Sequence, residues 1–138
     1  MKKIRYLSVE EAEWSHNRIL EVTGGERGDL ARANLEFVFE RVKDIGEGLE
    51  RNKAIVKKAA FLLYSLVTQH PFINGNKRTA FEVVDAFLEL NGYTLRAKTD
   101  EVYGVLSDVG AGKVSEEQVE DWIGTNLAKK NAKSRREA

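Results

Sequence analysis

The sequence predicts an all-α fold, a compact bundle of about six helices around one core. Apolar residues recur every three or four positions through most of the 138 residues, whereas the strict alternation typical of half-buried strands is scarce. Most glycines lie between these helical windows. A chain of this length buries about two-thirds of the surface that its unfolded form exposes, which is enough for a hydrophobic core. We therefore assign residues 1–127 to one helical domain.

The composition excludes several classes of protein. The chain has no cysteine, so it has no disulfide framework, thiolate metal site or cysteine nucleophile. No apolar run approaches the roughly 20 residues that a membrane helix needs. The basic start, residues 1–6, is not followed by the apolar core of a signal peptide. We expect a cytoplasmic protein with no membrane partner.

The first helix is expected from Ser8 to about Val22. Ser8 and Glu11 have the spacing of a capping box, in which each side chain bonds to the backbone N–H of the other residue. His16 lies on the apolar stripe of this helix, where we expect a buried, hydrogen-bonded structural histidine. The glycine-rich stretch 23–29 lacks the order of a dinucleotide-binding fingerprint, so it predicts a plain loop.

A second helix is expected over about 29–43, and residues 44–51 then form a flexible connection. The third helix covers about 52–69. It ends before Pro71, because proline cannot continue a helix and also restricts the residue before it. The side chains of the second helix expected to point inward are Leu30, Phe37, Val38 and Val42.

The second half of the chain continues the helical pattern. A helix over about 76–91 ends at Gly92, the usual position of a glycine after a helix. Residues 93–97 predict a short extended segment, and a helix over about 99–109 follows. The last helix, over about 115–127, begins with a second capping pattern, formed by Ser115 and Gln118.

The last residues, 128–138, differ in charge from the rest of the chain. They carry five basic side chains against one acidic, although the whole sequence has a formal net charge of zero. We expect a solvated, disordered tail, as is common at chain ends. Binding of nucleic acid or of an acidic partner by this tail is the alternative. The helical domain itself shows no nucleic-acid-binding motif.

The turn between the two central helices concentrates the polar chemistry of the chain. The first N–H groups of a helix lack backbone partners and lie at the positive end of its dipole, so a helix beginning at Asn76 offers an anion site. Gly75 allows close approach of the backbone and a positive φ. Lys77 and Arg78 are unfavourable in a first helical turn. Both cations are explained if an anion binds there.

The stretch 70–78, HPFINGNKR, resembles the motif HPFx(D/E)GN(G/K)R of the Fic/Doc family. Lys77, with Thr79 and Ala80 after the motif, is similar to the Doc (death-on-curing) branch, whereas the Fic branch has glycine at the lysine position. A weaker likeness extends from about residue 52 to 127, on the helix–loop–helix background of the family's all-α fold.

The resemblance implies transfer of a group from ATP to a hydroxyl of a target protein. Fic proteins usually transfer AMP and Doc transfers the terminal phosphate, so we expect phosphoryl transfer, with AMP transfer as the alternative. The family histidine falls on His70, the expected general base, and Arg78 would stabilise developing charge. The implied nucleotide- and phosphate-binding set is Phe72, Gly75, Asn76, Lys77 and Arg78.

The resemblance also implies cofactors and partners. ATP and Mg²⁺ are expected, together with a target protein of the kind found in the translation machinery. The family's inhibitory pattern (S/T)xxxE(G/N) is absent from the sequence, so we expect a separate antitoxin as the inhibitor. The connection over 44–51 is the candidate for the edge on which the target peptide docks.

One residue departs from the family motif. The acidic position, which is the metal ligand of the family, is Asn74 in this chain. Mg²⁺ prefers hard oxygen ligands and is often held by one or two carboxylates with substrate phosphates. The amide oxygen of Asn74 can coordinate a metal but adds no charge. We therefore expect weaker Mg²⁺ dependence or reduced activity.

Each motif residue also has a purely structural explanation. His70 could cap the end of a helix, and Arg78 could pair with Glu82, which is worth only about 0.2–0.5 kcal/mol. Phe72 is expected in the core and Thr79 on the helix surface.

Two other functions stay open. The first is a catalytically impaired module that binds nucleotide or a partner, as the amide of Asn74 suggests. The second is a helical domain that binds nucleic acid through its tail.

Overall fold

The structure is a computed structural model that describes residues 2–25, 32–72 and 74–130. Within these residues the chain forms six helices and one two-stranded sheet, so the predicted all-α class is confirmed. The helices are α1 (Val9–Thr23), α2 (Arg32–Arg41), α3 (Arg51–Thr68), α4 (Asn76–Leu90), α5 (Thr99–Gly110) and α6 (Glu116–Asn126). The strands are β1 (Tyr93–Leu95) and β2 (Leu127–Lys129).

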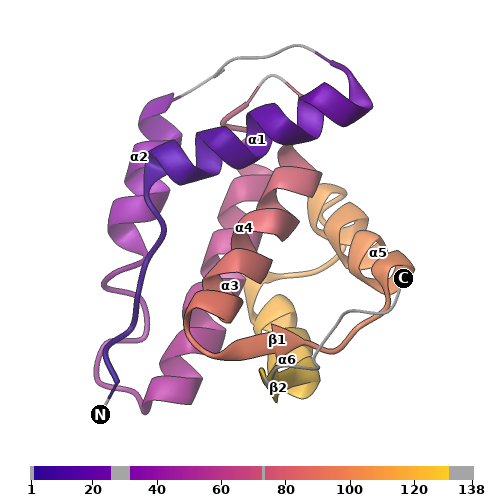
Figure 1. The fold of residues 1–138 in the computed structure, drawn as a ribbon. Helices are drawn as coiled ribbons and strands as arrows, with labels where there is room; N and C mark the ends of the chain where they lie inside the picture. The colour runs from indigo at the N-terminus through magenta and orange to yellow at the C-terminus, as the bar shows by residue number, and fades with distance from the viewer. Residues whose placement is uncertain (1, 26–31, 73, 131–138) are drawn as a thin grey trace.

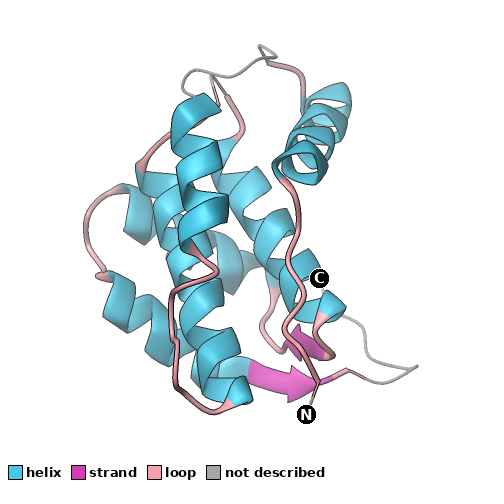
Figure 2. Ribbon diagram, turned by 90° about the vertical axis from the view of Figure 1, so that its left-hand side faces the viewer, coloured by secondary structure: helices cyan, strands magenta, loops and turns pink. Residues whose placement is uncertain are grey.

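Helices α3 and α4 form the centre of the bundle and pack along each other. Helices α5 and α6 lie on one side of this pair and α2 lies on the other (Figure 1). Helix α1 crosses the end of the pair where α3 gives way to α4, while the small sheet lies at the opposite end (Figure 2). The loop between the two central helices is therefore flanked by α1.

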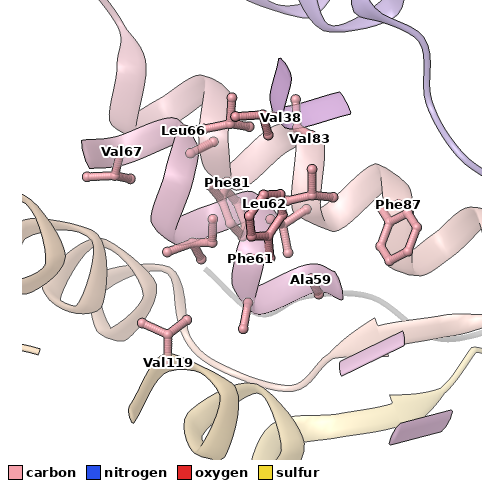
Figure 3. Close-up of a cluster of buried hydrophobic side chains, with 14 of the residues drawn as sticks. Val38, Ala59, Phe61, Leu62, Leu66, Val67, Phe81, Val83, Phe87 and Val119 are labelled. Atoms are coloured by element: carbon pink, nitrogen blue, oxygen red, sulfur yellow. The ribbon is translucent and has the colours of Figure 1, made fainter. Parts of the chain in front are cut away.

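Helix α3 is buried on most of its surface because other helices surround it. Figure 3 shows its Leu62 and Leu66 beside Val83 of α4, with Val38 of α2 close by and Val119 of α6 further along. Burying one such side chain fully contributes about 1.5–3 kcal/mol. Even so, no helix in the described part of the chain combines the length and apolarity that crossing a bilayer requires.

The helix starts and stops follow the signals in the sequence. Both predicted capping boxes are confirmed, at Ser8 with Glu11 and at Ser115 with Gln118. Helix α3 ends three residues before Pro71, and Gly92 follows α4 with a φ of 92°. Local signals of this kind need no knowledge of the tertiary fold, which explains why they can be predicted.

The two-stranded sheet extends the fold beyond the boundary expected at residue 127. β1 and β2 pair antiparallel, with Tyr93 opposite Lys129, and the N–H of Lys130 donates to the carbonyl of Gly92 at 2.9 Å. Residues 128–130, assigned from the sequence to a disordered tail, therefore continue the domain. A three-residue strand is too short to show alternation, and its partner lies far away in sequence. The remaining tail, 131–138, lies outside the described residues.

The inward face of α2 differs by one side chain from the expectation. Phe37 is 56% exposed, whereas Leu35, Val38, Phe39 and Val42 are buried. These four have the i, i+3, i+4, i+7 spacing of one helix face, and Phe37 lies off it. The expectation that Phe37 points inward is therefore wrong. Leu30 lies outside the described residues.

The connection after α2 is held by a buried lysine, although it was expected to be flexible. Lys58 of α3 is only 3% exposed, and its ammonium donates to the carbonyls of Val42, Lys43 and Ile45 at 3.0, 3.1 and 2.6 Å. The same ammonium lies 5.4 Å from the ring centre of Tyr6. The three carbonyls replace the water that a buried ammonium loses, so the turn is fixed to α3.

Replacing Lys58 with methionine should lower the free energy of unfolding by about 2–4 kcal/mol, because three carbonyl groups lose a charged donor inside the protein. Urea unfolding measures the change. Lys53→Met on the same helix is the control: Lys53 is exposed, so its replacement should change stability by no more than about 0.5 kcal/mol. Equal effects of the two substitutions would show that the buried contacts contribute nothing.

Candidate functional site

The candidate site is the loop between α3 and α4 together with the first turn of α4. Gly75 is the residue before α4 and has φ 77° and ψ 21°, a left-handed conformation that favours glycine. No side chain caps the start of α4, as is also the case for α3 and α5, whereas α1 and α6 have capping boxes. The amides of the first turn therefore keep their capacity to bind an anion.

His70 lies at the entrance of this loop and is exposed. Its φ of 47° is the only positive φ of a non-glycine residue in the described part of the chain. A side-chain-bearing residue in this conformation is strained and is held there by its surroundings, which is common at functional sites. The imidazole is not sealed in the core. It is therefore accessible to a substrate, as a general base must be.

Asn76 fixes the shape of the loop with its side chain. Its Oδ1 accepts from the N–H of Phe72 at 3.0 Å, and its Nδ2 donates to the carbonyl of Phe72 at 2.9 Å. The carboxamide thus bonds to both backbone polar groups of Phe72, once as a donor and once as an acceptor, and closes the loop. Phosphate binding by Asn76, predicted from the sequence, stays a prediction and falls most simply on its backbone N–H.

Phe72 packs against the loop from the protein core. Its side chain is 1% exposed and stacks on His16, with ring centres 3.9 Å apart and planes 9° apart. The burial of the ring confirms the expectation that Phe72 lies in the core, and its membership of the nucleotide-binding set stays a prediction. The expectation that His16 is buried and hydrogen-bonded is confirmed, since its Nε2 lies 2.6 Å from the carbonyl oxygen of Asn74.

The two cations of the first turn point to different neighbours. A Cβ placed on Gly110 would lie 3.1 Å from Cε of Lys77, so the Lys77 side chain runs along the end of α5. Cations are favoured at that negative end of a helix. Arg78 is exposed on the α1 side, and no described acidic side chain forms an ion pair with it. Arg78 is thus the better placed of the two for an anion at the loop.

A hollow of about 280 Å³ lies between α1 and α4 beside Arg78. Its walls combine two guanidinium groups with aromatic and aliphatic surface. It was not predicted from the sequence, although a tryptophan on the polar face of the first helix, 61% exposed in the structure, was an available signal. His70 does not line it. The lining residues are Trp14, Ser15, Arg18, Ile19, Val22, Arg78 and Glu82.

Asn74 offers little to a metal ion. Its side chain is exposed and lies against the turn after α1, where a Cβ on Gly25 would be 3.3 Å from its Oδ1. No group of three or more histidine, aspartate or glutamate side chains in the described residues could hold a metal ion. The chain therefore fits Mg²⁺ poorly on its own, and contributes one neutral oxygen at most.

Thr79 corrects one further expectation. The expectation that it lies on the helix surface is wrong, because it is buried, and its hydroxyl has no hydrogen-bond partner among the described residues. Position four of α4 faces the bundle, in which α4 packs against α3, α1 and α5. Thr79 therefore belongs to the packing beneath the site.

Two comparisons with known proteins bear on this site. A family model described as the Fic/DOC family matches residues 6–88, which include the whole of 70–78. The chain is also similar to Toxin Doc of Mycolicibacterium smegmatis, with 42% identity over 77 residues. That match covers 56% of this chain and 59% of the relative, so the chain spans little more than half the length of the relative that it matches.

Proposed function

The chain belongs to the Fic/DOC family, and from that membership we propose that it is a Doc-like toxin of a toxin–antitoxin module that transfers a phosphate from ATP to a hydroxyl of a target protein. The observation that carries the proposal is the uncapped start of α4, with an exposed His70 before it and Arg78 beside it. A base next to an anion site is what hydroxyl phosphorylation requires.

In the proposed reaction the hydroxyl oxygen of the target attacks the γ-phosphorus of ATP. The bond from that phosphorus to its bridging oxygen breaks, and ADP leaves. His70 accepts the hydroxyl proton as the new oxygen–phosphorus bond forms. AMP transfer would use the same base, with attack on the α-phosphorus and loss of pyrophosphate. Lys77, where the Fic branch has glycine, is the reason for preferring phosphoryl transfer.

The rest of the site would stabilise charge. Negative charge on the phosphate oxygens is met by backbone N–H groups of the first turn of α4 and by the guanidinium of Arg78. The backbone N–H groups are fixed by the helix and by the two hydrogen bonds between the Asn76 carboxamide and Phe72, here called the Asn76 clamp, so they need little rearrangement during the reaction. Phe72 and His16 hold the loop from the protein interior.

Magnesium bound to ATP would neutralise part of the phosphate charge. Asn74 Oδ1 is the ligand that this chain could add to that ion. No step is assigned to the ion, because the described residues fit it poorly. ATP is the proposed co-substrate. An ATP-using enzyme with a target in the translation machinery would work in the cytoplasm, the location expected from the sequence.

Restoring the family carboxylate tests the role of Asn74. Asn74→Asp should strengthen Mg²⁺ binding in the presence of ATP by about tenfold or more, because a charged oxygen replaces a neutral one. Calorimetric Mg²⁺ titration measures it. Asn52→Asp is the matched control, since Asn52 is exposed at the start of α3, away from the site. If both variants bind Mg²⁺ as the wild type does, position 74 is not a ligand.

A separate antitoxin is the proposed inhibitor, because the chain lacks the family's own inhibitory pattern. The target peptide is proposed to dock at the connection over 44–51. Lys58 bonds to Ile45 within this connection and to the two residues just before it, which suits that role, since a fixed edge can align a peptide without first being ordered.

The function is tested by incubating the purified chain and a cell lysate with ATP labelled on either the α- or the γ-phosphate. The proposal expects γ-label on one or a few proteins, with mass spectrometry showing a single added phosphate on a hydroxyl side chain. Transfer of α-label would replace phosphoryl by AMP transfer. Absence of both labels would overturn the enzyme proposal.

Two observations favour a second candidate, a Fic-fold module that binds nucleotide with little turnover. The amide at position 74 and the absence of a carboxylate cluster from the described residues both weaken metal-assisted transfer. This candidate expects ATP binding by calorimetry without label transfer. The labelling experiment therefore separates it from the toxin proposal.

A further inference from the structure

A single buried side chain from α1 contacts the candidate loop at three positions. His16 is 1% exposed and lies 58 residues before Asn74 in the sequence. Its ring stacks on Phe72, and its Nε2 lies 2.6 Å from the carbonyl oxygen of Asn74. A Cβ on Gly75 would lie 3.6 Å from Cδ2 and 3.7 Å from Nε2 of the same ring. The imidazole thus spans the loop up to the start of α4.

The hydrogen bond to Asn74 determines which nitrogen of the His16 ring carries a hydrogen. A carbonyl oxygen can only accept, so Nε2 of His16 must carry a hydrogen and donate it to Asn74. The ring therefore acts as a donor at this nitrogen. It cannot be replaced by an apolar residue of the same shape without losing the bond.

The same bond sets the direction of the next amide. The peptide unit joining Asn74 and Gly75 is planar and trans, so its C=O and N–H point in opposite directions. With the carbonyl of Asn74 drawn toward α1, the N–H of Gly75 points away from α1. An amide so directed can join those of the first turn of α4 in binding an anion.

We propose that His16 is a positioning residue of the phosphate-binding loop: by donating to the carbonyl of Asn74, it keeps the N–H of Gly75 turned toward the bound phosphate. The inference rests on the proposed function for the identity of the anion. The Asn76 clamp holds the Phe72 end of the loop and His16 holds the Asn74 end. The two contacts together hold the loop at both ends.

Two substitutions separate the donor from the ring. His16→Phe keeps an aromatic ring against Phe72 but has no donor, whereas His16→Gln places an amide N–H near the position of Nε2 but has no ring. Hydrogen–deuterium exchange of the backbone amides from Asn74 to Arg78, melting temperature, and kcat and KM for ATP with γ-label are compared in both variants and in the wild type.

The proposal expects His16→Phe to melt near the wild type while the loop amides exchange roughly tenfold faster. Its kcat should fall by up to about a hundredfold, because a small displacement of a fixed group is costly. His16→Gln should restore slow exchange and most of the turnover. Unchanged exchange and kcat in His16→Phe, or equal losses in both variants, would overturn the role of the donor.

The exchange measurement keeps this inference separate from the proposed function. If no variant, nor the wild type, transfers label, the enzyme proposal fails, but exchange of the loop amides still decides whether the His16 donor positions the loop. If the wild type transfers label and both variants match it in exchange and rate, only the role of His16 fails.

Discussion

Replacing His70 with asparagine should lower the rate of label transfer by about 10²–10⁴-fold and leave ATP binding nearly unchanged. A positioned general base contributes a factor of this size, and the asparagine amide cannot accept the proton. Asparagine is chosen because it tolerates a positive φ better than most residues. The loop, in which His70 has φ 47°, should therefore keep its shape. Single-turnover γ-label transfer and calorimetric ATP affinity measure the two effects.

Two comparisons make this result specific to the imidazole. His70→Gly also fits the backbone and should be as inactive as the asparagine variant, with unchanged or higher stability. His16→Gln, which keeps the loop held, should stay active. Growth arrest on expression should disappear with both His70 variants. If His70→Asn transfers label at the wild-type rate, the base is another group and the proposed mechanism is wrong.

The sequence predicts those parts of the site that depend on local patterns. The end of α3 before Pro71, the left-handed Gly75 and the uncapped start of α4 at Asn76 all follow from rules that act within a few residues. The family motif added chemical roles to these positions. It could be identified because its residues are contiguous.

Side-chain direction could not be predicted in the same way, because tertiary contacts decide it. Lys77 and Arg78 are adjacent and equally basic, yet one runs along α5 and the other faces α1. Phe72 is a motif residue whose ring turned out to be packed on His16. The β1–β2 sheet and the hollow between α1 and α4 likewise join segments that are distant in sequence.

The placement of Arg78 leads to the second large effect. Arg78→Gln should lower kcat by about 10²–10³-fold, since removing one preorganised donor from a developing negative charge costs that much. Glutamine keeps a similar length and a good helix propensity, so α4 should form normally. Lys77→Gln should cost less than Arg78→Gln, because its ammonium lies near the end of α5. Steady-state γ-label transfer gives both values.

Arg96→Gln provides the control for loss of an arginine charge, because Arg96 is exposed next to β1, at the end of the bundle away from the loop. Its kcat should equal that of the wild type. Binding of ATP should weaken with Arg78→Gln and not with Arg96→Gln, and the difference should shrink as salt screens the charge. If Lys77→Gln proves the more damaging substitution, the lysine must leave α5 to reach the phosphates, and the anion would then bind on the α5 side of the first turn and not on the α1 side.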